Sequence, residues 1–317
     1  MKKNTILILL VFFIFLYGCQ SPNKEISPNN IETKVWEKDF IIALIPEQDI
    51  FTQKKRYEPI CRYLSKKLGY NVKTNVLESY NAIYENMREK KIDAGFFGSF
   101  NYTLARSKLN VIPLVRPLWK NGTSTYTGFI FTRKDSGIGL DINKWKGTTL
   151  ALVHQHTTAG YFFPRWYLAK YGINNIETFF KKIIYTGSHD TAILSVFNHE
   201  ADIGAAKNQI YEIMISKNPK MAESLTVLAE SRAVPDNGIA VREDIPEKLR
   251  EKIKNILLNM DQNTEGKTIL HEFGAVKFIE NKDIDYNPVR EMIEPLNIDL
   301  KTYDVGDYKH QYAGELK

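Results

Sequence analysis

Cysteine is scarce in this sequence, whose 317 residues include only Cys19 and Cys61. A disulfide framework is therefore excluded as the basis of the fold. Charge of one sign does not dominate either, because 43 Lys and Arg residues are scattered among 37 Asp and Glu residues, for a formal net charge of +6. A balance so modest and so dispersed argues against a nucleic-acid partner.

The motifs of the common enzyme classes are missing as well. The sequence has no G-x-S-x-G, H-E-x-x-H, C-x-x-C or P-loop pattern, and no glycines of a dinucleotide-binding loop follow the first expected strand. His154 and His156 could place two rings on one face of an extended chain, but no third ligand at a suitable spacing joins them. We therefore predict a protein that is not an enzyme and that has neither a metal site nor a cofactor.

The N-terminus resembles a bacterial lipoprotein signal. Lys2 and Lys3 precede a short apolar run, and Leu16-Tyr17-Gly18-Cys19 is similar to a lipobox. We predict a signal peptide at residues 1–18, a lipid anchor on Cys19 and a flexible tether at residues 19–35, which are poor in bulky apolar side chains. The protein is then held at the extracytoplasmic face of the cell membrane. The alternative is an uncleaved N-terminal helix with an incidental cysteine.

From Phe40 onward, short β-rich apolar runs alternate with amphipathic helical patterns, which is typical of an α/β fold with a largely parallel sheet. The chain is longer than a single core usually supports, so two lobes are expected. Extended segments at 126–135 and 237–244 look like strands that cross between them. We predict lobe one at residues 36–130 plus 240–300, lobe two at 131–239 and a C-terminal tail at 301–317, with the ligand in the cleft between the lobes.

Five blocks of the sequence, in order, resemble one family. They are IALIPEQD with the helix after it (42–72), YNAIYENMREKKIDAGFFGSFNYTLA (80–105), VHQHTTAGYFFPRWYLAKYGI (153–173), TGSHDTAILSVFNHEADIGAAKNQIYE (186–212) and SRAVPDNGIAVREDIPEKL (231–249). The family is that of the phosphate-, phosphite- and phosphonate-binding components of ABC transporters, a branch of the type II periplasmic binding proteins. The resemblance implies a two-lobed type II fold with a small oxyanion in the interlobe cleft.

Thr157 and Thr158 precede a helical pattern, so their hydroxyls and the free N–H groups of the first helical turn can point at one anion. An ordinary threonine N-cap is the alternative. His189 begins another helical pattern, where its ring could donate a hydrogen bond to an oxyanion; the alternative is an exposed or a core histidine. The resemblance favours the binding role for both sites.

Ser99, Asn101 and Tyr102 follow a buried strand and could bond the same oxyanion from lobe one. The alternatives are that Ser99 caps the helix and that Tyr102 packs in the core with its hydroxyl bonded elsewhere. The resemblance also places Phe51 where the family has an aromatic ligand contact, although it could equally be a loop residue on the surface.

Asp236 and Asn237 lie in the turn sequence PDNG, where Asp236 could accept a hydrogen bond from a protonated oxyanion or meet an ammonium group; simple turn chemistry is the alternative. Family members that bind aminoalkylphosphonates have an acidic residue near Asn208. Because this chain has Asn208 there, with Lys207 beside it, the departure shifts the expected ligand to phosphate, phosphite or a simple phosphonate.

The predicted function is the capture of that oxyanion and its delivery to the permease of an ABC importer by a monomeric, membrane-anchored protein. Two alternatives stay open at this point. One is a binding protein of the same fold for a sulfonate or a thiamine-precursor pyrimidine, and the other is a sensory protein that presents its ligand to a membrane receptor kinase.

Overall fold

The computed structural model describes residues 38–303. The predicted signal peptide, Cys19, the tether and most of the predicted tail lie outside these residues. Within 38–303, no helix is both long and apolar enough to cross a membrane.

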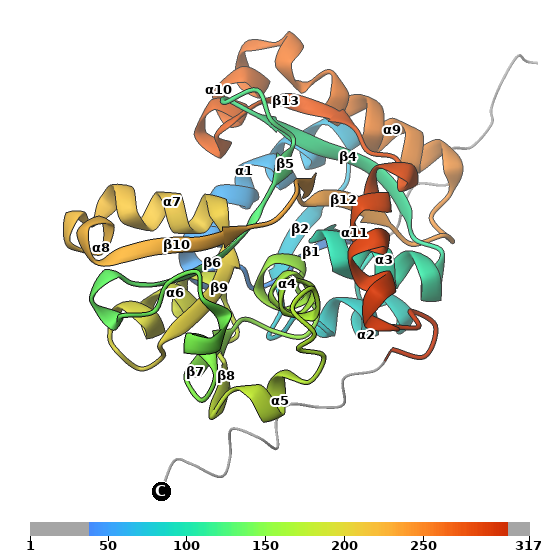
Figure 1. The fold of residues 1–317 in the computed structure, drawn as a ribbon. Helices are drawn as coiled ribbons and strands as arrows, with labels where there is room; N and C mark the ends of the chain where they lie inside the picture. Colours follow the sequence, from blue (N-terminus) through green and yellow to red (C-terminus); the bar gives the residue numbers. More distant parts are fainter. Residues whose placement is uncertain (1–37, 304–317) are drawn as a thin grey trace, which may run out of the picture. The chain divides into compact units, whose positions relative to one another are not determined.

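The first lobe is built on a mixed six-stranded sheet with the order β13-β4-β12-β3-β1-β2 (Figure 1). Its strands are β1 (Phe40–Leu44), β2 (Val72–Val76), β3 (Ala94–Phe97), β4 (Ile112–Trp119), β12 (Gly238–Val241) and β13 (Ala275–Glu280). β1 runs parallel to β2 and β3, whereas β12 lies antiparallel to both β3 and β4. The carboxyl ends of β1 and β3 therefore point the same way, and polar residues follow both strands.

Five helices belong to this lobe: α1 (Ile50–Leu68), α2 (Ala82–Arg88), α3 (Ser99–Leu109), α9 (Glu247–Leu258) and α10 (Thr264–Phe273). The first begins at Ile50, where the Asp49 side chain caps it by accepting a hydrogen bond from the Thr52 amide at 2.8 Å. It ends at Gly69, which takes the left-handed conformation that glycine adopts without strain. Cys61 lies in its buried face, as expected of a small core residue.

The second lobe is built on a five-stranded sheet with the order β10-β6-β9-β7-β8. Its strands are β6 (Gly128–Arg133), β7 (Thr149–Leu152), β8 (Lys182–Tyr185), β9 (Ile203–Lys207) and β10 (Leu225–Glu230). Its helices are α4 (Phe163–Ala169), α5 (Ile176–Phe179), α6 (His189–Phe197), α7 (Asn208–Lys217) and α8 (Pro219–Ser224), and a π-helical turn, η3 (Thr158–Phe162), precedes α4. Short 3-10 turns lie at Lys134–Ser136, Ile142–Trp145, Met260–Gln262, Asp283–Tyr286 and Glu294–Leu296.

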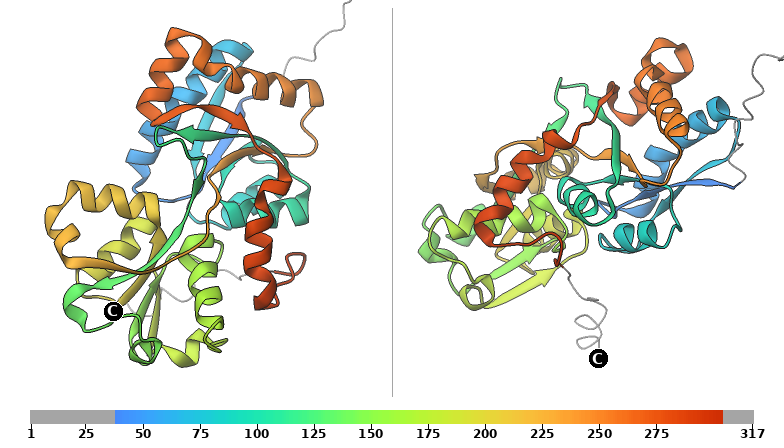
Figure 2. Two further views of the ribbon diagram at one scale, coloured as in Figure 1. Left: turned by 45° about the horizontal axis from the view of Figure 1, so that its top comes forward. Right: turned by 90° about the vertical axis from the view of Figure 1, so that its right-hand side faces the viewer.

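Two chain segments cross between the lobes and pair with each other (Figure 2). β5 (Thr125–Tyr126) and β11 (Val234–Pro235) form a short antiparallel ribbon, in which Val234 faces Tyr126. The crossing thus comes a few residues before the positions indicated by the sequence, and the predicted segments continue from it as β6 and β12. Because β6 and β12 each enter a sheet from the opposite lobe, they run antiparallel to their neighbours, and both sheets are mixed rather than largely parallel.

The last helix, α11 (Asn287–Ile293), differs from the predicted division, which assigns residues 240–300 to lobe one. Its side chains Val289, Met292 and Ile293 are buried in the apolar cluster that also contains Phe162 and Phe163 of lobe two. Phe100 of α3 belongs to the same cluster, so this helix packs on elements of both lobes. The apolar positions of a terminal helix give no sign of which lobe they contact.

Candidate functional site

A small polar cavity lies where the strand ends and helix N-termini of both lobes meet. It is lined by Ile45, Glu47, Tyr80, Gly98, Ser99, Tyr126, His156, Thr157, Thr158, His189, Lys207 and Asn237. Of the residues predicted to bind the ligand, Ser99, Thr157, Thr158, His189 and Asn237 are therefore brought together. The cavity holds about 10 Å³, so a phosphonyl group enters only if the walls separate.

The two threonines lie at the start of the π-helical turn. The Thr157 hydroxyl donates to the His154 carbonyl at 2.7 Å, and the Thr158 hydroxyl accepts from the backbone N–H of Phe100, in the other lobe, at 3.0 Å. A hydroxyl has one donor and two acceptor sites, so Thr158 keeps its proton for a further bond, whereas Thr157 must turn its proton away from the His154 carbonyl to donate to a ligand. Thr158 therefore sits at a junction of the two lobes and can turn its proton towards the cavity.

At the start of α3, Ser99 lines the cavity, but the predicted ligand contacts Asn101 and Tyr102 do not. The Ser99 hydroxyl donates to the Pro235 carbonyl at 2.5 Å. Asn101 donates instead to the Tyr80 carbonyl at 3.1 Å, outside the cavity lining. The Tyr102 hydroxyl donates to Asp283 at 2.9 Å while its ring stacks on Tyr286, so Tyr102 takes the core position that was its alternative role.

His189 begins α6 and is held from two sides. Its Nδ1 accepts a hydrogen bond from the backbone N–H of Lys207 at 3.1 Å, and its own backbone N–H donates to the Glu47 carbonyl of the other lobe at 3.1 Å. Burial and the neighbouring Lys207 charge lower the pKa of His189 to about 3, so the ring is neutral at pH 7. With Nδ1 accepting, the proton lies on Nε2, which is the tautomer that can donate to an oxyanion.

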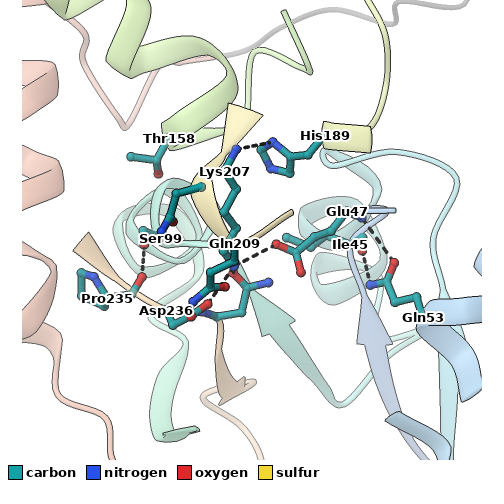
Figure 3. Close-up of polar contacts among 12 residues, drawn as sticks. Ile45, Glu47, Gln53, Ser99, Thr158, His189, Lys207, Gln209, Pro235 and Asp236 are labelled. Carbon is teal, nitrogen blue, oxygen red and sulfur yellow. Dashed lines mark hydrogen bonds and ion pairs between the residues drawn. The ribbon is translucent and has the colours of Figure 1, made fainter. Parts of the chain in front are cut away.

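Lys207, at the end of β9, was not among the predicted site residues, yet it reaches into the centre of the site (Figure 3). Its Nζ lies 2.7 Å from Asp236 Oδ1, 3.3 Å from Glu47 Oε1 and 3.3 Å from Asn237 Oδ1. Burial by itself would lower the pKa of Lys207, but the two carboxylates outweigh it and raise the pKa above its ordinary value. A charged ammonium group is therefore fixed beside the cavity.

Asp236 lies just behind this ammonium and is fully buried. It accepts hydrogen bonds from Lys207, from Gln209 at 2.6 Å, from the Trp119 indole and from the Asn237 amide at 2.7 Å. Burial would raise the pKa of Asp236, but Lys207 and these hydrogen bonds lower it below its usual value. Asp236 is thus ionised and has its oxygens engaged by the chain itself.

Two other candidates lie away from the cavity. The Asn208 side chain accepts from the Thr127 amide at 2.9 Å and donates to Glu212 at 3.3 Å, so it holds the crossing segment in place. Phe51 lies in the first turn of α1 and is 83% exposed. Neither residue lines the cavity.

Two polar side chains of the cavity wall have no hydrogen-bond partner among the described residues. They are Tyr80, whose hydroxyl is buried, and His156, in which neither ring nitrogen is paired. Buried polar groups are nearly always paired, so unpaired groups facing a cavity indicate a ligand there. The sequence analysis considered His156 only as a possible metal ligand, and it did not single out Tyr80.

A wider groove opens beside the cavity and shares Glu47 and Lys207 with it. It has a volume of about 430 Å³ and is lined by side chains from both lobes, including Arg56, Trp119 and Gln209. The groove thus leads from the surface to the ammonium of Lys207. Within residues 38–303, no cluster of His, Cys, Asp and Glu side chains could hold a metal ion.

Two α/β lobes joined by paired crossing strands, with a polar cavity where the lobes meet, define a bilobal substrate-binding protein. The family model described as "ABC transporter, phosphonate, periplasmic substrate-binding protein" matches residues 42–286. The chain belongs to this family, and the predicted family and the predicted two-lobed type II fold are both confirmed.

Individual relatives agree with the assignment. The phosphonates-binding periplasmic protein of Escherichia coli is 25% identical over 84% of this chain and 79% of its own length. The probable ABC transporter phosphite binding protein PhnD1 of Prochlorococcus marinus is also 25% identical, over 81% of this chain and 89% of its own. A solved structure of PhnD1 from Prochlorococcus marinus in complex with methylphosphonate is 25% identical, with a TM-score of 0.72, over 82% of this chain and 98% of that one.

Proposed function

We propose that the chain captures a small phosphorus oxyanion, namely phosphate, phosphite or a simple phosphonate, and delivers it to the permease of an ABC importer. The observation that carries the proposal is the unpaired Tyr80 hydroxyl and His156 ring at a cavity also lined by Thr157, Thr158 and His189. A tetrahedral oxyanion presents acceptors in several directions at once, which suits hydroxyl and imidazole donors that converge from both lobes. The names of the relatives, which bind phosphonates and phosphite, support the same class of ligand.

The hydrogen-bond donors at the site also suit an anion. Lys207 is the cationic donor, its charge is balanced by Glu47 and Asp236, and the remaining donors are neutral groups of the chain. A neutral hydrogen bond contributes about 0.5 to 1.5 kcal/mol and one to a charged group about 1.5 to 3 kcal/mol. A few such bonds together supply about 8 kcal/mol, which corresponds to a Kd of about 1 μM.

We further propose that the protein carries out no chemical reaction on its ligand. The family consists of substrate-binding transport proteins. In addition, the Ser99 hydroxyl is committed to a backbone carbonyl rather than to a histidine, so it is not activated as a nucleophile.

The lipid anchor on Cys19 belongs to this proposal as well. Two acyl chains suffice for stable membrane attachment, whereas one is marginal. We expect Cys19→Ser to release the protein from membranes while it still binds ligand. Retention of Cys19→Ser in the membrane fraction at high salt would contradict the anchor.

Calorimetric titration of the mature protein against phosphate, phosphite, methylphosphonate and a sulfonate tests the ligand class. We expect measurable affinity for at least one phosphorus oxyanion, and a loss of about a hundredfold or more in the double variant Thr157→Ala with Thr158→Ala, because each lost bond to a charged ligand costs about 1.5 to 3 kcal/mol. His199→Asn, an exposed residue, is the control. A sulfonate bound more tightly than every phosphorus compound, or full affinity in the double variant, would overturn the proposal.

A further inference from the structure

Lys207 closes a cage of oxygen atoms inside the cleft. The cage consists of Asp236, Glu47 and Asn237, whose side-chain oxygens lie 2.7 to 3.3 Å from its Nζ, and of the Tyr126 ring, whose centroid is 4.4 Å away. Lys207 is 4% exposed and Asp236 is 0% exposed, so both are buried although the groove reaches them. Two carboxylates, an amide oxygen and an aromatic face are the groups that bind an alkylammonium ion.

The position of this cage matters because it adjoins the oxyanion donors. Glu47, Asn237, Tyr126 and Lys207 itself line the same cavity as Thr157, Thr158 and His189. A ligand with a phosphonyl group at one end and an amino group at the other would therefore find both of its ends matched, if the cage were open. In this chain, the cage is filled by an ammonium group that the chain supplies.

We propose that Lys207 is the specificity-determining residue of the site: its ammonium closes the carboxylate cage of Asp236 and Glu47 to the amino group of an aminoalkylphosphonate. The inference rests on the proposed function. The ligand is then restricted to phosphorus oxyanions without a cationic substituent. Asn208, the neighbour that the sequence singled out, takes no part, since its side chain bonds Thr127 and Glu212.

The exclusion has two physical causes. A tethered ammonium is already in place, so a competing amine must first break a buried ion pair, and breaking a buried pair leaves uncompensated charge. An amine that stayed outside the cage would instead lie beside the positive charge of Lys207.

The test compares two ligands with the same carbon skeleton, ethylphosphonate and 2-aminoethylphosphonate, in calorimetric titrations. We expect the wild-type protein to bind ethylphosphonate at least about tenfold more tightly. Lys207→Met keeps the methylene chain but opens the cage to a positive charge, so we expect the preference to shift by about a hundredfold or more towards the amine. Lys217→Met, the same change at the exposed end of α7, is the matched control and keeps the wild-type preference.

A second variant tests whether the carboxylates of the cage cause this shift in ligand preference. In Lys207→Met combined with Glu47→Gln, one acid of the cage is neutralised, and we expect most of the gained affinity for the amine to disappear. An unchanged ligand ratio in folded Lys207→Met would overturn the inference. If that variant does not fold, the wild-type comparison decides alone, because equal or tighter binding of the amine refutes a closed cage and clear rejection supports it. A wild-type protein that binds neither phosphonate nor any other phosphorus oxyanion would instead refute the proposed function.

Discussion

At the scale of single residues, the site contains buried histidines that are neutral: His156 and His189 line the cavity, and His154 lies two residues before His156. Burial lowers the pKa of His154 to about 4, that of His156 to about 3 and that of His189 to about 3. As the pH falls, each of these rings gains a proton at a higher pH in the unfolded chain than in the folded one, since the ordinary pKa of histidine is about 6.5. Below that pH, protonation of these rings stabilises the unfolded state relative to the folded state.

The first prediction is a loss of stability in mild acid. Where the unfolded state binds more protons, the free energy of unfolding rises with pH, so here it falls as the pH drops from about 6.5 towards 4, by about 1.4 kcal/mol per pH unit for each histidine. We expect His156→Phe to reduce this slope by about one proton, since neither nitrogen of His156 has a partner to lose. Urea unfolding between pH 4 and 7 measures the slope. A slope in His156→Phe equal to that of the wild-type protein would contradict the prediction.

The sequence could predict only part of the site at this scale. Thr157, Thr158, His189 and Ser99 are at helix starts, where local pattern and family resemblance single them out as candidates. The structure places all four at one cavity, and their binding roles stay predictions. Lys207, Glu47 and Tyr80 come from separate parts of the chain, and their convergence depends on how the lobes meet, which a local pattern does not contain.

At the scale of elements, the turn that carries the threonines depends on close backbone packing. In η3, the Phe162 amide donates to the Thr157 carbonyl at 3.2 Å, five residues back, which makes the turn wider than an α-helical one. Gly160, in the middle of it, lies against Val153, and a Cβ added there would be 2.4 Å from Val153 Cγ2. The wide turn at Thr157 therefore requires a residue without a side chain at position 160.

The second prediction follows from this contact. Gly160→Ala forces the turn away from Val153, and we expect a loss of about 1 to 3 kcal/mol in the free energy of unfolding, as is usual for overpacking. Ligand affinity falls as well, because the displaced turn holds Thr157 and Thr158. Gly139→Ala is the matched control, since nothing lies within 4 Å of a Cβ at that position. Thermal unfolding and titration of both variants measure the effects, and wild-type affinity in Gly160→Ala would show that the turn does not position the donors.

The whole molecule follows the alternation of strands and helices that the sequence indicates, and the two lobes with their crossing segments follow from it. The direction of β6 and β12 in the sheets and the position of α11 could not be predicted, because both depend on which lobe a segment contacts after it leaves the other. The crossing ribbon of β5 and β11 is short, so few backbone bonds oppose a rotation of one lobe against the other.

The last prediction is that the two lobes open to admit the ligand and close around it. The polar contacts that hold the lobes together at the cavity include His189 N–H to the Glu47 carbonyl at 3.1 Å, Phe100 N–H to Thr158 at 3.0 Å, and the Lys207 to Glu47 ion pair at 3.3 Å. Ligand entry must break such contacts, because the cavity of about 10 Å³ does not admit a phosphonyl group while they persist. A bound oxyanion forms bonds to both lobes and therefore favours the closed arrangement. The size of the shift equals the difference between its binding free energies for the closed and the open arrangement.

We expect small-angle scattering to show a smaller radius of gyration for the mature protein at saturating methylphosphonate than without ligand. The double variant Thr157→Ala with Thr158→Ala, at the same ligand concentration, shows less compaction, because it lacks two of the side chains that join the ligand to lobe two. Calorimetry on the same samples establishes saturation. An unchanged radius in saturated wild-type protein would mean that the ligand enters without a movement of the lobes, and it would contradict a clamp that closes on the ribbon of β5 and β11.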